Sequence, residues 1–96
     1  MLHIISRSPV EPVILERTAP GDVLLFVENA VLALLRQGRL SVRLEASLTQ
    51  NRLLALHADL QLRGIETEAL LPGIEVIDYG GFVKLTEENP VIQSWC

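Results

Sequence analysis

Several polar side chains in this 96-residue chain follow directly on short apolar runs. In sheets of parallel strands, ligands and reacting groups gather beyond the carboxyl ends of the strands. Side chains at such positions therefore predict one polar cleft that contacts a ligand or a partner protein. These candidates are Ser8, Asn29, His57, Asp59, Asp78 and Tyr79.

The types of these residues allow a few chemistries, but their spacing supports none of them. Ser8, His57 and Asp78 can be written as a nucleophilic triad, yet no nucleophile-elbow glycines flank Ser8. His57 and Asp59 are too close in sequence for metal ligation from one helix. The turn after the first apolar run lacks the glycines of a phosphate-binding loop. We expect no catalytic residue among them, no cofactor and no metal.

The chain ends in two unusual residues, Trp95 and Cys96, which are its only tryptophan and its only cysteine. A terminal thiol could accept sulfur as a persulfide. We favour an inert thiol, because no basic residue lies nearby in sequence to activate it. Trp95 is interpreted as a packing anchor, either in this fold or in a neighbour's groove. His3, inside the first apolar run, is interpreted as structural.

Four short apolar runs are predicted to be the strands that carry these residues. None alternates cleanly between apolar and polar positions, which is typical of parallel strands covered on both faces. Pro-Gly turns lead into the second and the fourth run. The runs span residues 2–6, 23–28, 52–57 and 74–78.

Helical segments are predicted between these strands. The first ends near Thr18, and it begins either with a capping box from Ser8 to Glu11 or with Glu11 as the cap and Pro12 as its first residue.

Two more segments follow in the middle of the chain. Asn29 is predicted to cap a helix over residues 30–36, with Gly38 beyond its end. Residues 44–51 are expected to add further turns, and a short helix is expected over residues 58–63.

The last helix is predicted to begin after Asp78, which can cap it. Gly80 and Gly81 lower its propensity by roughly 1 kcal/mol each, so we expect close packing at its start to compensate. Helical spacing places one stripe of side chains along it. That stripe consists of Tyr79, Phe82, Val83 and Thr86.

The alternation of strands and helices predicts an α/β fold. We expect residues 1–96 to form a single three-layer α/β/α domain with a mainly parallel sheet of four to five strands. Residues 90–96 are predicted to be a C-terminal tail that docks through Trp95.

Composition excludes several protein classes. No apolar run approaches the roughly 18 residues that span a bilayer, and no secretory signal opens the chain. These features and the single cysteine predict a cytoplasmic protein. The formal net charge is −4 and the basic residues are scattered, so direct nucleic-acid binding is not expected. The mean hydropathy of +0.34 exceeds what one small core can bury, which predicts apolar burial against another subunit. A tightly packed parallel sheet, with strands that are apolar on both faces, is the alternative explanation, and the two are compatible.

The chain resembles the TusB/DsrH family of sulfur-relay subunits nearly from end to end. Order and spacing of several segments carry the resemblance. These are Met1-Leu2-His3 with Ser8-Pro9, Gly21-Asp22 with Leu24-Leu25, Ala55-Leu56 with Asp59-Leu60 and Arg63-Gly64, the stretch Ile77–Thr86, and Gln93-Ser94-Trp95.

The resemblance implies the DsrE/DsrF-like fold and a non-catalytic subunit of a sulfurtransferase complex. Its implied partners are TusC/DsrF-like and TusD/DsrE-like subunits, with a TusE/DsrC-like acceptor reached through the complex. The main sulfur-carrying cysteine is implied to belong to the TusD/DsrE-like subunit. The implied process is 2-thiolation of the wobble uridine of tRNA.

Three alternatives stay open. The chain could be a DsrH-type subunit in sulfur oxidation, a self-standing sulfur carrier that uses Cys96, or a small-ligand module built around Ser8, Asn29, His57 and Asp78. The sequence has Asn29-Ala30-Val31 where the family often has Asp-Gly-Val, and it lacks the internal cysteine of some DsrH-like members. An isolated chain could associate with itself.

Overall fold

The computed structural model describes all 96 residues, which form five strands and the helices and loops that connect them. In chain order the elements are β1 (Leu2–Ile5), α1 (Pro12–Glu16), β2 (Val23–Phe26), the 3-10 helix η1 (Glu28–Leu34), α2 (Ser41–Ser47), β3 (Arg52–Leu56), α3 (His57–Leu62), the 3-10 helix η2 (Thr67–Ala69), β4 (Glu75–Ile77), α4 (Tyr79–Glu88) and β5 (Ile92–Trp95).

The five strands form one sheet in the order β4-β3-β2-β1-β5, and every neighbouring pair is parallel. β1 lies between β2 and β5, so that Leu2 pairs with Val23 on one side and with Ile92 on the other. Parallel neighbours need crossover connections, which the helices supply. The predicted α/β fold with a parallel sheet is confirmed.

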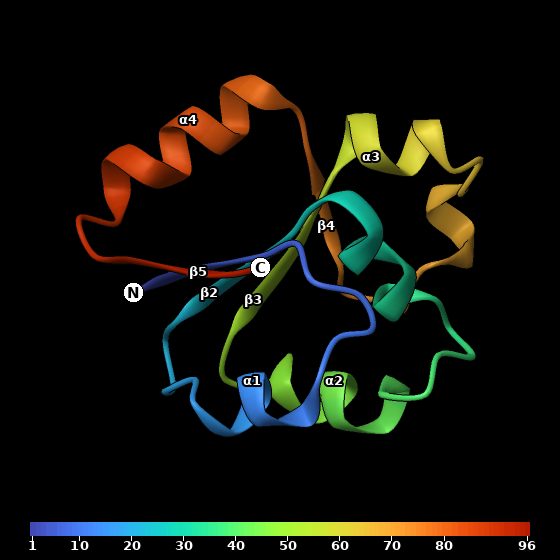
Figure 1. Ribbon diagram of the computed structural model, residues 1–96, viewed down its shortest axis with the longest axis horizontal. Helices are drawn as coiled ribbons and strands as arrows, with labels where there is room; N and C mark the ends of the chain where they lie inside the picture. Colours follow the sequence, from blue (N-terminus) through green and yellow to red (C-terminus); the bar gives the residue numbers. More distant parts are fainter.

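Helices cover both faces of the sheet, but unequally. α1 and α2 lie on one face, and α4 crosses the other (Figure 1). The apolar cluster under α1 and α2 holds 15 buried residues, whereas the cluster under α4 holds seven. Successive strand residues point to opposite clusters, as Leu24 and Leu25 do, which explains why these strands have continuous apolar sequences.

The strands end one or two residues earlier than predicted, and helices follow β2, β3 and β4 almost at once. β3 ends at Leu56 and His57 already opens α3. α1 begins at Pro12 with Glu11 as its cap, which decides between the two predicted starts. Glu11 makes no capping hydrogen bond through its side chain.

The predicted cap at Asn29 is wrong. The segment is a 3-10 helix that starts at Glu28, and Asn29 lies inside it. Glu28 adopts a positive φ of 52°, which turns the chain directly from β2 into η1. The Asn29 side chain instead accepts a hydrogen bond from Nε of Arg63, at 2.8 Å.

Residues 90–96 are not only a docked tail, because Ile92–Trp95 add a fifth strand to the sheet. This strand carries polar residues and is largely exposed, so it lacks the apolar signal of the buried strands. Backbone pairing with β1, which no hydrophobic pattern records, forms it.

α4 begins as predicted, with Oδ1 of Asp78 accepting a hydrogen bond from the Gly81 N–H at 2.8 Å. The predicted stripe is mostly not the buried face. Leu85 is the buried residue and Phe82 packs partly against the core, whereas Tyr79 and Val83 are 64% and 55% exposed.

Candidate functional site

The carboxyl ends of β1 to β4 lie along one edge of the sheet because all these strands run in the same direction. The polar residues predicted from strand ends therefore share that edge. Asn29 and Asp59 share Arg63 as a partner. The other predicted side chains make no hydrogen bond to this group, so the set does not converge on one cleft.

Asp59 lies in the first turn of α3, directly after β3, and is only 8% exposed. Its Oδ2 accepts a hydrogen bond from the backbone N–H of Glu28 at 2.8 Å. The Arg63 guanidinium lies against Asp59 and also donates to Asn29. Asp59 is thus a structural clamp that joins α3 to the start of η1, rather than an open ligand contact.

Asp78 and Tyr79 lie at the end of β4 and have separate roles. The Asp78 carboxylate is engaged as the cap of α4. The Tyr79 ring is exposed to solvent, so it is available for contact with another molecule.

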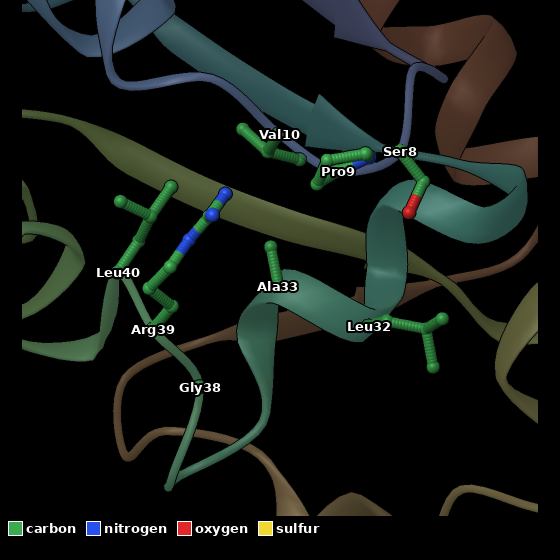
Figure 2. Close-up of a pocket in the computed structure, with 8 residues that line it drawn as sticks. All are labelled: Ser8, Pro9, Val10, Leu32, Ala33, Gly38, Arg39 and Leu40. Carbon is green, nitrogen blue, oxygen red and sulfur yellow. The ribbon is translucent and has the colours of Figure 1, made fainter.

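Ser8 lines a hollow of about 180 Å³ between the loop after β1 and the segment that follows η1. Figure 2 shows Ser8 and Leu32 at one end of this hollow and Arg39 and Leu40 at the other. No hydrogen bond or ion pair engages the Arg39 side chain. His57 lines a different, open hollow of about 460 Å³ beside α3, with Gln61 among its other lining residues.

The triad of Ser8, His57 and Asp78 is not assembled. Ser8 and His57 line separate hollows, and the Asp78 carboxylate caps α4. Asn29 and Asp78 line neither hollow, so the predicted small-ligand cleft is divided.

A buried polar cluster beside β1, formed by Asp22 and by residues from both ends of the chain, was not predicted as such. His3 is 2% exposed, and its Nε2 lies 2.9 Å from Oδ2 of Asp22. The Trp95 indole Nε1 donates to Nδ1 of His3 at 3.1 Å. The prediction that His3 is structural and that Trp95 is a packing anchor agrees with these contacts.

Asp22 receives several donors at once. Burial raises the pKa of its carboxyl, but hydrogen bonds from the Ala19 N–H, from His3 and from the Met1 amino group outweigh burial and bring that pKa below its ordinary value. The only sequence signal for this role is the position of Asp22 at the turn that leads into β2.

Cys96 follows β5 and is an exposed free thiol. No cluster of three or more His, Cys, Asp and Glu residues could hold a metal ion. None of the helices is both long and apolar enough to cross a membrane.

Known proteins resemble this chain over almost its whole length. A family model described as DsrH like protein matches residues 7–91. The TusB protein of Serratia proteamaculans (strain 568) is 40% identical, with 99% of this chain and 100% of the relative covered. The TusB protein of Pectobacterium parmentieri is 36% identical, with the same coverage of both chains.

A solved structure has the same fold. It is a protein of unknown function from Methanobacterium thermoautotrophicum, with a TM-score of 0.78 over 97% of this chain and 95% of the other. Its sequence identity is 17%, so this likeness concerns the fold alone.

Proposed function

We propose that this chain, which belongs to the DsrH family, is a non-catalytic subunit of a sulfur-relay complex. In this proposal, the complex passes persulfide sulfur toward 2-thiolation of the tRNA wobble uridine. The observation that carries this proposal is the full-length match to TusB proteins at up to 40% identity. We also propose that this complex acts in the cytoplasm.

The side chains at the strand ends support a non-catalytic role for this subunit. Sulfur relay needs a thiol that forms and transfers a persulfide. Carboxylates, amides, hydroxyls and an imidazole follow β1 to β4 at this edge of the sheet. The one thiol, Cys96, follows the parallel strand β5 at the same edge, exposed and with no basic residue nearby in sequence to activate it. A partner subunit of the TusD/DsrE type would therefore supply the reacting thiol, and a TusE/DsrC-like protein would accept the sulfur.

The exposed apolar side chains support assembly with other subunits. Tyr79 and Val83 are one turn apart on α4, and helical neighbours at this spacing share one face. Large exposed apolar residues that lie together are typical of protein interfaces. We propose that this face of α4 contacts a TusC/DsrF-like or TusD/DsrE-like subunit.

The first experiment is co-expression of the full chain with TusC/DsrF-like and TusD/DsrE-like proteins from the same organism, followed by native mass spectrometry. A complex that contains all three kinds of subunit is the expected result. If folded partners assemble with each other and leave this chain out, the proposal is wrong.

A second experiment separates tRNA thiolation from the alternative role in sulfur oxidation. Deletion of the gene should abolish wobble 2-thiouridine in tRNA hydrolysates, and a Cys96→Ser copy should restore it. Unchanged thiouridine after deletion would favour the sulfur-oxidation alternative. Failure of a stably folded Cys96→Ser protein to restore it, together with a persulfide on Cys96 by mass spectrometry, would favour a self-standing carrier.

A further inference from the structure

The buried contact between Trp95 and His3 fixes the protonation state of the imidazole. An indole N–H can only donate, so Nδ1 of His3, 3.1 Å from it, must be the unprotonated acceptor. Nε2 then carries the proton and donates to the Asp22 carboxylate at 2.9 Å. This arrangement holds only for neutral His3.

A second proton on the imidazole ring would break one of its two hydrogen bonds, either the one to Asp22 or the one from Trp95. Imidazolium donates from both nitrogens, so Nδ1–H would face the Trp95 N–H, donor against donor. The other charged groups at this site are the Asp22 carboxylate and the Met1 amino group, which lies 3.2 Å from Oδ1 of Asp22. The carboxylate still accepts from Nε2 of the protonated ring, so the conflict falls on the Trp95 contact.

Trp95 is the side chain that anchors β5. Its ring stacks near that of His3, with centroids 6.3 Å apart, and it packs against the larger apolar cluster. The other three side chains of β5 are exposed, and the strand lies at the edge of the sheet. Without the Trp95 side chain, the strand is held to β1 by backbone hydrogen bonds and by the Ser6 hydroxyl, which donates to the Trp95 carbonyl at 3.4 Å.

We infer that His3 is a proton-operated latch for the C-terminal strand. Uptake of a proton from solvent at Nδ1 displaces the Trp95 indole from its site, and β5 then separates from β1. The rest of the sheet stays folded, because β1 to β4 have their own buried clusters. Release opens the outer backbone edge of β1, which lies beside β5 in Figure 1.

Trp95 is the only tryptophan, so its fluorescence reports this latch directly. Histidine ordinarily changes charge between about pH 5 and 8, so emission of the full chain is recorded from about pH 8 to pH 5. A reversible red shift on acidification, with faster amide exchange at Ile92–Trp95 and unchanged far-ultraviolet circular dichroism, is expected. An unshifted emission, or a shift that accompanies global unfolding, overturns the inference.

Three variants assign the response to one imidazole. His57→Asn removes the other histidine and should keep the red shift. His3→Asn cannot titrate but keeps an acceptor near the Nδ1 position, so its emission should stay blue-shifted across the range. His3→Gln keeps a donor toward Asp22 but no acceptor for Trp95, so its emission should be red-shifted already at neutral pH. Loss of the acid-induced red shift in His57→Asn contradicts the latch. This control tests the proposal even if a His3 variant does not fold, because His3 is then the one remaining histidine.

Discussion

The carboxylate of Asp59 holds the backbone N–H of Glu28 at 2.8 Å, although the two residues are 31 positions apart. Glu28 is the one non-glycine residue with a positive φ, at 52°. That conformation costs roughly 1–2 kcal/mol for a residue with a Cβ. The hydrogen bond from the Glu28 N–H to Asp59 therefore maintains a strained turn at the edge where the parallel strands end.

Removing the clamp is expected to destabilise the fold. Asp59→Ala leaves the Glu28 N–H without its acceptor in a partly buried setting, so we expect the free energy of unfolding to fall by about 1–3 kcal/mol. Urea denaturation of the two proteins measures this. A change below about 0.5 kcal/mol would show that the clamp does not stabilise the turn.

Glu28→Gly is the complementary test of strain. Glycine adopts a positive φ at no steric cost, but it also loses more chain entropy on folding. The relief of strain outweighs that entropy, so we expect stabilisation by about 0.5–1 kcal/mol. A lower melting temperature for this variant would contradict the strain.

The two adjacent glycines of α4 should respond in opposite directions to alanine. Gly80→Ala meets only the Asp78 carboxylate at 3.4 Å, so it should stabilise the helix by about 0.5–1 kcal/mol. Gly81→Ala places its Cβ 3.0 Å from Cβ of Ile77, and the forced shift should outweigh the gain in propensity. Thermal unfolding of both variants measures this difference. Equal melting temperatures would contradict the close approach between Gly81 and Ile77.

The lowered pKa of Asp22 predicts acid sensitivity with a definite sign. A carboxyl whose pKa is lower when folded stabilises the fold above its ordinary pKa, about 4, and this contribution disappears as the pH falls through the folded value. Asp22→Asn should therefore cost about 2 kcal/mol near neutral pH and progressively less below about pH 4. A difference in unfolding free energy that stays constant with pH would contradict this assignment.

The ion pair between Arg52 and Glu75 offers a contrast on the surface. Hydrogen bonds from Arg52 hold the pKa of Glu75 below its ordinary value, but both side chains are about half exposed. Water and salt screen such pairs, so Glu75→Gln should cost less than about 1 kcal/mol. We expect that cost to shrink further in 1 M salt, where the screening length is about 3 Å. Chemical denaturation at low and high salt measures both effects.

Partner binding through α4 predicts a selective loss. Val83→Asp leaves the fold within about 0.5 kcal/mol, because Val83 is exposed, but it should prevent co-purification with the partner subunits. Leu62→Asp on α3 is the matched control, since Leu62 is exposed but has no exposed apolar neighbour on its helix. If Leu62→Asp disrupts the complex and Val83→Asp does not, the interface lies on α3.

Hydrophobic pattern alone was enough to predict the parallel α/β fold. Continuous apolar runs such as Val23–Phe26 require cover on both faces, and intervening helices supply it. The cap at Asp78 was predicted because it depends on neighbouring residues only. The family, too, could be inferred from motifs spread along the chain, and the match over residues 7–91 confirms it.

Only the tertiary structure decided which polar side chains meet. The clamp between Asp59 and Glu28, the contact between Trp95 and His3, and the fifth strand each join residues distant in sequence. Local propensity records none of them, because their energy comes from satisfying buried polar groups and backbone edges across the fold. For the same physical reason, the sequence places these side chains at one edge of the sheet but does not record their partners. In the structure Asn29 and Asp59 share Arg63, whereas the Asp78 carboxylate caps α4.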